Sequence, residues 1–369
     1  MPPNSFAAGL FILTVVYILG QRFVVTGSLN LKYIFLAGVI VNIVLLFFWN
    51  AASDDLYTFI YRSRIISEFG QNPYYRPYDN FSDDPLYNSL KTIWSHKVTI
   101  YGPASLLIGS FLSRLGGDSF LLSIFVFKFA YAVLNVTNIF LVWKITKSNL
   151  SVYLYALNPV LLFEFALNNH MDLIMTTFAF LSVYFWLKKR RYPILSWIFL
   201  TISVLVKFFT AVLIPLYFVF GLKKMRGLFG KVCYGAVFGA TIFMSGVLLY
   251  LPFWESPDVF SRLLEISGAE TTSPAIGIRL FGRRTSVAMF WLIYLVLIFM
   301  AMRARPTKKN FLKYASLLIA VFFATGLSLF LPWYMTVLIS VLVLYVGFSK
   351  KAWYVHIATL YAAGIYLTL

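Results

Sequence analysis

The residues that could do chemistry begin with two adjacent aspartates, Asp54 and Asp55, soon after an apolar run that ends at Trp49. Carboxylates at the mouth of a membrane helix are costly to hold there, which suggests that they serve a function. Two nearby carboxylates repel each other, so we expect one of them to have a raised pKa and to accept a proton near neutral pH. The pair could act as a general base or a cation ligand, or it could merely solvate one helix end and cap the next.

A second set of polar residues surrounds a short turn that contains His170 and Asp172. Glu164 precedes this turn within an apolar segment, where an unpaired charge would cost roughly 2.5–3.5 kcal/mol, so we expect it to face a cavity or a partner. Lys207 interrupts a later apolar run. It could reach lipid headgroups or bind an anionic lipid-linked substrate from inside the protein. Taken alone, His170 and Asp172 could equally belong to a solvated turn.

Further candidates flank these two sets of residues. Arg62 and His96 lie in the polar segment that follows the aspartates, and Tyr101 marks its end. Arg279 lies in a later polar loop, where it or Arg283 could bind a phosphate group. The sequence has no phosphate-cradling glycine loop, zinc-ligand spacing or nucleophile elbow, so a soluble nucleotide-sugar or ATP site is unsupported.

The elements that must position these residues are membrane helices. Apolar residues make up 60% of the chain and charged residues only 12%, whereas a soluble domain carries roughly 25% charged residues. The run 193–221 is too long for one crossing and contains Lys207 near its middle, so we divide it there. The sequence thus predicts a single-domain, all-α polytopic membrane protein over residues 1–369, with about twelve spans. The predicted spans are 6–21, 33–49, 119–143, 151–167, 172–187, 193–206, 208–221, 229–252, 286–302, 311–331, 333–348 and 352–368.

The distribution of charge predicts the orientation of these helices. The chain has 31 Lys and Arg against 13 Asp and Glu, a net charge of +18 that would suggest nucleic acid binding in a soluble protein. If the short run 103–113 lies in the interface, one set of loops holds most of the basic residues and none of the acids, as cytoplasmic loops do. We therefore place 50–118, 253–285 and both termini outside. We expect the basic loops to contact membrane lipids and not nucleic acid.

Taken in order, several stretches resemble the GT-C membrane glycosyltransferases, and most closely the polyprenyl-phosphate-mannose-dependent mannosyltransferases of prokaryotic envelopes. Gly102 stands where this family often has proline, and Leu331 stands where it often has histidine. The matching stretches are Asp54-Asp55 with Tyr57, Arg62 and Arg64; Gly70-Gln71-Asn72-Pro73-Tyr74; His96 with Thr99-Ile100-Tyr101-Gly102-Pro103; Asn158-Pro159 with Glu164; Asn169-His170-Met171-Asp172; Val206-Lys207; and Pro332-Trp333-Tyr334.

The resemblance implies a catalytic base in the first outer loop, which we assign to Asp55 with Asp54 as the alternate. It implies inverting transfer of a sugar, with mannose expected, from a polyprenyl-phosphate donor to a lipid-linked or glycan acceptor. The resemblance places this reaction at the extracytoplasmic face of the plasma membrane. We expect no cofactor, because Lys and Arg alone can hold a monophosphate donor, although the carboxylates could also hold Mg²⁺ or Mn²⁺. The residues expected to bind substrate are Lys207, His170, Asp172, Arg62, His96, Tyr101, Glu164 and Arg279.

Two other functions stay open from the sequence. A transporter or flippase of lipids or lipid-linked oligosaccharides could line its pathway with Glu164, Lys128 and Asn135. Against this, the polar groups gather at one membrane surface, whereas transporters keep their sites near the midplane. A polymerase or ligase of envelope polysaccharides is the third possibility, and it would require a lipid diphosphate donor.

Overall fold

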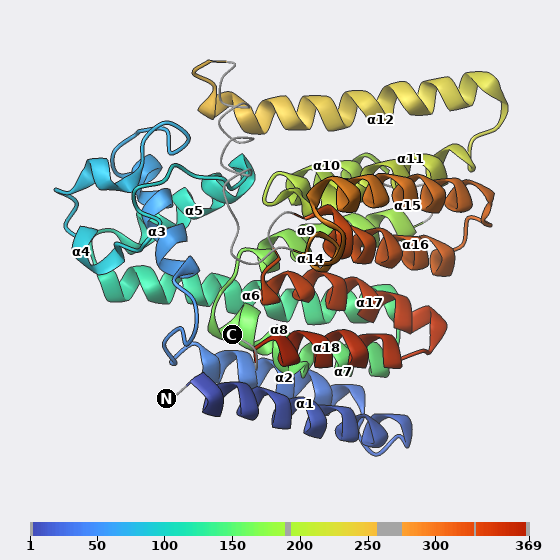
Figure 1. Ribbon diagram of the computed structural model, residues 1–369, viewed down its shortest axis with the longest axis horizontal. Helices are drawn as coiled ribbons and strands as arrows, with labels where there is room; N and C mark the ends of the chain where they lie inside the picture. The colour runs from blue at the N-terminus through green and yellow to red at the C-terminus, as the bar shows by residue number, and fades with distance from the viewer. Residues whose placement is uncertain (1–2, 189–192, 257–274, 328–329, 367–369) are drawn as a thin grey trace.

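The computed structural model describes residues 3–188, 193–256, 275–327 and 330–366. Within these ranges every regular element is a helix, which confirms the predicted all-α class. Long helices lie side by side in one broad array, and α1 begins at the same end of the array at which α18 ends (Figure 1). Of the predicted outer loop 253–285, residues 257–274 lie outside the described residues.

Within the described residues, each apolar run that the sequence marks as a span is mostly helical. Among the described residues, five helices are long and apolar enough to cross a membrane, or six if one bent pair counts as a single span. The exact number of crossings and the sidedness of the loops stay predictions. The helices are α1 (Pro3–Val25), α2 (Leu31–Leu45), α6 (Phe120–Thr146), α7 (Asn149–Ala156), α8 (Pro159–Leu161), α9 (Asp172–Leu187), α10 (Pro193–Val204), α11 (Ile214–Leu222), α12 (Gly227–Tyr250), α15 (Arg283–Arg303), α16 (Lys308–Val321), α17 (Met335–Ser349) and α18 (Trp353–Ile365).

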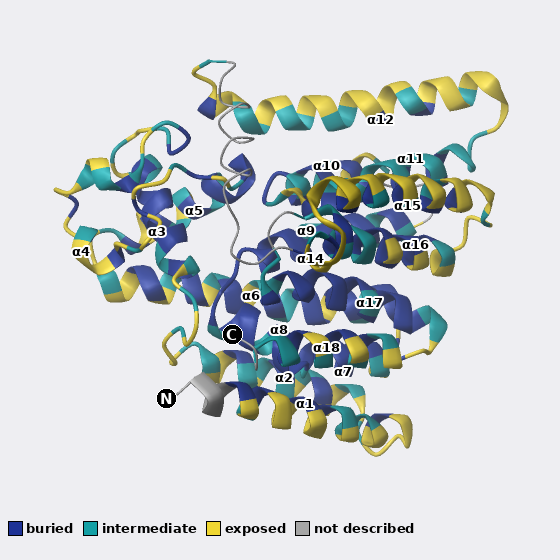
Figure 2. Cartoon of the chain, viewed as in Figure 1, coloured by how far each residue is buried: buried dark blue, intermediate teal, exposed yellow. Residues whose placement is uncertain are grey.

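Burial varies strongly across the array, as expected for helices that meet both protein and lipid. Figure 2 shows α17 almost wholly buried in the centre, whereas α12 is exposed along most of its length. Most of the exposed side chains of α12 are themselves apolar, including Phe229, Phe243 and Leu248. A large exposed apolar surface of this kind fits a helix that faces hydrocarbon.

The bent pair of helices consists of Asn149–Ala156 and Pro159–Leu167, and an asparagine–proline step causes the bend between them. Asn158 caps α8, because its side-chain oxygen accepts hydrogen bonds from the backbone N–H groups of Val160 and Leu161. Pro159 stands at the first helical position, where its missing N–H costs nothing. The chain bends by 44° here and continues as a π-helical turn, η2 (Leu162–Leu167). Such turns are frequent at functional sites, and this one carries Glu164.

The run divided at Lys207 forms a hairpin. Lys207 has an extended backbone and separates α10 from a 3₁₀ turn, η3 (Phe208–Leu213), which leads into α11. The Ser182 hydroxyl of α9 contacts both Ser196, near the start of α10, and Tyr217 of α11. The ends of α10 and α11 that are distant from Lys207 therefore lie together, and the two helices run antiparallel with Lys207 at their turn.

The polar segment after α2 folds into a lobe of short helices at one end of the array (Figure 1). Its centre is Arg64, whose guanidinium donates to both carboxylate oxygens of Asp84, at 2.8 and 2.7 Å, and to Asp118 at 2.8 Å. The run expected to lie in the interface is α5, which starts at a proline and packs on α3 outside the array. The helices of this lobe are α3 (Asp55–Ser67), η1 (Tyr78–Phe81), α4 (Tyr87–Leu90) and α5 (Pro103–Gly116).

Candidate active site

A buried imidazole joins two carboxylates where the lobe meets the helix array. Nδ1 of His170 lies 2.9 Å from Oδ2 of Asp55, and Nε2 lies 3.1 Å from Oε2 of Glu164. The side chains of His170 and Glu164 are fully buried, whereas that of Asp55 is 20% exposed. An imidazole that faces a carboxylate on each side is stabilised as the doubly protonated cation.

The turn that carries His170 is held by Lys128 of α6. The Lys128 ammonium donates to the Leu167 carbonyl and to Oδ1 of Asn169, both at 3.1 Å. Asn169 has a φ of 58°, in the left-handed region that asparagine tolerates better than most residues. The chain therefore reverses sharply after η2 and presents the next side chain, His170, toward α3.

Asn168 ties the linker before α3 to this same turn. Its side-chain oxygen accepts hydrogen bonds from the backbone N–H groups of Ala51 and Ala52, and its carbonyl accepts one from the Asn50 amide at 2.8 Å. Asp55 follows as the first residue of α3. Two segments far apart in the sequence are thus fixed side by side, which brings Asp55 to His170.

The charged groups around Asp55 differ from those expected when only its sequence neighbour, Asp54, is considered. Burial disfavours the charge on Asp55, but the hydrogen bond from His170 and the nearby positive charges of His170, Lys207 and Arg62 outweigh it and lower the pKa of Asp55. Burial also opposes the imidazolium, yet Asp55 and Glu164 raise the pKa of His170 to about 10. The expected rise in pKa is therefore wrong for Asp55. Asp54 is exposed, and the groups that surround Asp55 are mainly cations.

Lys207 points into the protein and pairs with Asp172. Its ammonium donates to Oδ2 of Asp172 at 2.8 Å, and the two side chains are 13% and 1% exposed. The same ammonium lies 4.3 Å from the centre of the Tyr334 ring and 4.7 Å from that of Phe209, within range of cation–π attraction. Oδ1 of Asp172 is buried without a hydrogen-bond partner among the described residues. We refer to Asp55, Glu164, His170, Asp172 and Lys207 together as the polar cluster.

Arg62 and Tyr101 border the polar cluster from the lobe. Arg62 is buried, with its guanidinium 5.2 Å from the centre of the Tyr101 ring. Within the part of the chain that the structure describes, the Arg62 Nε has no hydrogen-bond partner. A buried guanidinium with an unused donor can bind an anion.

The family model described as alpha-(1->6)-mannopyranosyltransferase, N-terminal domain, matches residues 4–222, more than half of the chain. The chain belongs to this family. The matched region contains the whole polar cluster, and the assignment confirms the resemblance to GT-C mannosyltransferases. The chain thus combines membership of a mannosyltransferase family with helices long and apolar enough to cross a membrane.

Solved structures that align with this chain include two of the Archaeoglobus fulgidus oligosaccharyltransferase, one in the apo form and one with zinc and sulfate. Both are 14% identical to this mannosyltransferase-family protein, with TM-scores of 0.49 and 0.45. The alignments cover 89% and 91% of this chain but 51% of each of those chains, so it spans about half their length. No curated protein matches the chain. Family membership therefore rests on the match over residues 4–222.

Three of the predicted site residues of this family member are exposed, unlike the members of the polar cluster. Asp54 is exposed directly before α3, His96 is exposed on the lobe, and Arg279 is exposed on α14 (Ile276–Phe281). Their exposure contrasts with the burial of the polar cluster. Among the described residues, no group of three or more His, Cys, Asp or Glu side chains could hold a metal ion. The absence of a cofactor stays a prediction.

Two aromatic residues of the site were not expected from the sequence. The Trp333 ring stacks on the His170 imidazole with 4.4 Å between ring centres and 16° between planes, and Tyr334 faces Lys207. Both belong to a 3₁₀ turn, η6 (Pro332–Tyr334). The family resemblance had marked this turn, but only the packing of α17 against α9 reveals what its rings contact.

Proposed function

We propose that this protein transfers mannose, with inversion, from a polyprenyl-phosphate donor to a glycan or lipid-linked acceptor at the extracytoplasmic face of the plasma membrane. The observation that carries the proposal is the local environment of the Asp55 carboxylate. Its carboxylate is partly exposed, and it borders a buried group of cations at the lobe end of the array. A reacting hydroxyl could therefore reach the carboxylate while a phosphate meets the cations.

Asp55 acts as the general base in this proposal. The hydrogen bond from His170 engages Oδ2, so the acceptor hydroxyl would approach Oδ1. As the hydroxyl oxygen attacks the anomeric carbon, its proton passes to the Asp55 carboxylate and the bond to the phosphate oxygen breaks. A single displacement converts a β-linked donor into an α-linked product. General-base assistance of this kind contributes roughly 10²–10⁴-fold to the rate.

Lys207 and Arg62 stabilise the departing phosphate in this proposal. Negative charge develops on the leaving oxygen, and fixed cations in a buried site stabilise it without reorganising. The contact with Asp172 holds the Lys207 ammonium in place, and the unused Arg62 Nε offers a donor. Arg62 thus suits the role of the outer-loop arginine better than the exposed Arg279.

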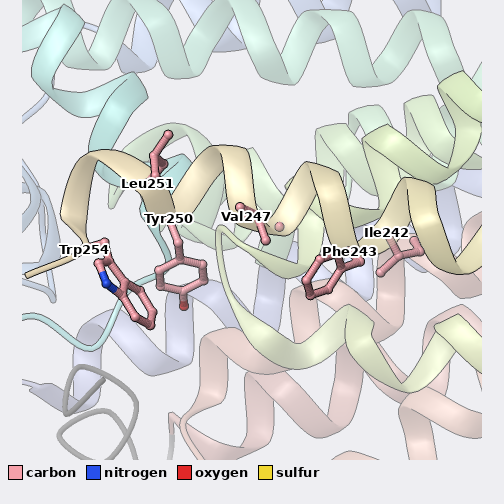
Figure 3. Close-up of a pocket in the computed structure, with 7 residues that line it drawn as sticks. Ile242, Phe243, Val247, Tyr250, Leu251 and Trp254 are labelled. Carbon is pink, nitrogen blue, oxygen red and sulfur yellow. The ribbon is translucent and has the colours of Figure 1, made fainter. Parts of the chain in front are cut away.

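The polyprenyl chain would lie along an apolar groove on α12. This groove has a volume of about 510 Å³, and Tyr250 and Phe243 project from the same side of the helix (Figure 3). At its lobe end, the Tyr250 ring lies 6.4 Å from that of Tyr74, whose hydroxyl donates to the Tyr101 carbonyl. The groove therefore ends near the border of the polar cluster, which supports a lipid-linked donor. Its lining consists of Ile242, Phe243, Gly246, Val247, Tyr250, Leu251 and Trp254.

The test is a donor screen with the purified full chain in lipid nanodiscs. Radiolabelled mannose would be offered as polyprenyl-phosphate-mannose, polyprenyl-diphosphate-mannose or a nucleotide sugar, together with an α-mannoside acceptor. We expect transfer from the monophosphate donor alone, and an α-(1→6) linkage by NMR of the product. Transfer only from a diphosphate or a nucleotide sugar would overturn the proposal. Movement of labelled lipid across the bilayer without product would do the same and indicate a transporter.

A further inference from the structure

A second groove lies at the opposite end of the helix array from the polar cluster. α9 begins at Asp172 in that cluster and ends at Leu187 beside the groove, so its 16 residues separate the two sites by about 24 Å. The groove has a volume of about 770 Å³. It lies where α9 ends, α10 begins, α11 ends and α12 begins, on the side of Figure 1 away from the lobe.

The polar part of this groove is cationic. Lys188, Lys224 and Arg226 line it, and none of its described lining residues is acidic. The Lys224 ammonium lies 4.2 Å from the centre of the Trp186 ring, which holds it at the wall. Arg226 precedes the first turn of α12, and its side chain does not cap that helix. The N–H groups at the start of a 24-residue helix add partial positive charge, so the groove favours an anion.

The remaining walls of the groove are apolar and aromatic. Trp197 packs edge-on against Tyr234 with 5.4 Å between ring centres, and Val237 continues this wall one turn further along α12. Gly221 allows the close approach of α11 and α12, because a Cβ there would lie 2.0 Å from the Tyr234 hydroxyl. An inorganic anion would leave these apolar walls in contact with water. A ligand with an anionic head and a hydrocarbon tail would satisfy both parts of the groove.

We propose that this groove binds one anionic phospholipid from the membrane leaflet opposite the polar cluster. Lys188, Lys224 and Arg226 bind the headgroup phosphate, and an acyl chain lies against Trp197 and Val237. Basic pockets between membrane helices on the positively charged side of a protein suit such lipids. The bound lipid contacts the ends of α10 and α11 that are distant from Lys207, the residue at their turn. The proposal does not depend on the reaction proposed above.

Glycines on α12 allow the groove to be blocked without removing any charge. A Cβ built at Gly230 meets only Met225, at 3.9 Å, so a larger side chain can enter the groove without a clash. Gly230→Leu should therefore fold normally and occlude the site. Gly239→Leu is the matched control, because Gly239 lies on the same helix outside the groove and a Cβ there meets nothing within 4 Å.

Binding would be measured by native mass spectrometry of the full chain with phosphatidylglycerol or phosphatidylcholine. We expect the wild type to prefer phosphatidylglycerol at least tenfold. Gly230→Leu should weaken its binding at least tenfold, and Gly239→Leu should leave it unchanged. Thermal unfolding in lipid-free detergent should be the same for both variants. Equal affinity for the two lipids, or full phosphatidylglycerol binding by Gly230→Leu, would overturn the proposal.

A second pair of variants separates a specific site from general attraction to a basic surface. The groove variant changes Lys188, Lys224 and Arg226 to glutamine. The control changes Lys308, Lys309 and Lys313, which are exposed basic residues of α16 outside the groove. Both lose the same charge, so only the groove variant should lose phosphatidylglycerol binding. Equal loss in both variants would show nonspecific attraction and contradict the proposed site.

Discussion

Replacement of His170 by asparagine tests whether the imidazolium controls the protonation of Asp55. Nδ1 of His170 lies 2.9 Å from Oδ2 of Asp55, and Glu164 flanks the other ring nitrogen. The amide nitrogen of asparagine corresponds in position to Nδ1 of histidine, so it can still donate to Asp55. The substitution therefore keeps a hydrogen bond and removes a positive charge.

The size of the effect follows from the separation of the two charges. Unit charges about 4 Å apart attract by about 4 kcal/mol at an effective dielectric constant of about 20, and one pKa unit corresponds to about 1.4 kcal/mol. The full attraction of about 4 kcal/mol is therefore equivalent to about three pKa units. Loss of only a third of this attraction would still raise the pKa of Asp55 by about one unit. Without the cation, the Asp55 carboxylate is less favoured. It should then take up its proton at a pH at least one unit higher.

The assay is the pH dependence of kcat/KM for mannosyl transfer, extended well below about pH 4 because the pKa of Asp55 in the wild type is lowered from its ordinary value. We expect the acidic limb of His170→Asn to lie at least one unit above that of the wild type. His170→Ala, which also lacks the hydrogen bond, should shift the limb at least as far. An acidic limb that stays in place in both variants would refute the coupling of Asp55 to His170.

Three further predictions concern the same region. Lys207→Met should lower kcat at saturating donor by roughly 10²–10³-fold, because the departing phosphate loses a fixed cation and Asp172 is left unpaired. Arg64→Gln should lower the free energy of unfolding by about 3–5 kcal/mol, measured by denaturation in detergent, because Asp84 loses its buried partner. The ion pairs of His170 should stabilise the protein fully below pH 6.5 and be lost as the pH rises through about 10. Melting temperatures between pH 6 and 11 should therefore fall more steeply for the wild type than for His170→Asn.

Much of the helical architecture was predictable, because long apolar runs have few alternatives to a helix in a membrane. The division of the run 193–221 at Lys207 also follows from the sequence, since a charge in mid-membrane is costly. The helical turn of the Pro332-Trp333-Tyr334 motif fits the known preference of proline for the first helical position. The assignment of the run 103–113 to a helix outside the array rested on its length, which is short for a crossing, and on the distribution of charge.

The contacts within the site could not be predicted, because they join segments far apart in the chain. Trp333 stacks on His170 across 163 positions, and Lys128 of α6 fixes the turn at Asn169. The error about the pKa of Asp55 has the same origin. Its sequence neighbour is another acid, but its neighbours in space are His170 and two other cations. Local sequence indicates which side chains are ionisable, and tertiary packing determines their partners.

The most direct test of the central claim compares the two adjacent aspartates in one assay. Single-turnover transfer of mannose from polyprenyl-phosphate-mannose would be measured for the wild type, Asp55→Asn and Asp54→Asn. Asp55 contacts His170, whereas Asp54 is exposed and serves as the matched control. We expect Asp55→Asn to reduce the rate by roughly 10²–10⁴-fold and Asp54→Asn to change it by less than about tenfold. Wild-type rates for Asp55→Asn, in a protein that folds normally, would contradict the account.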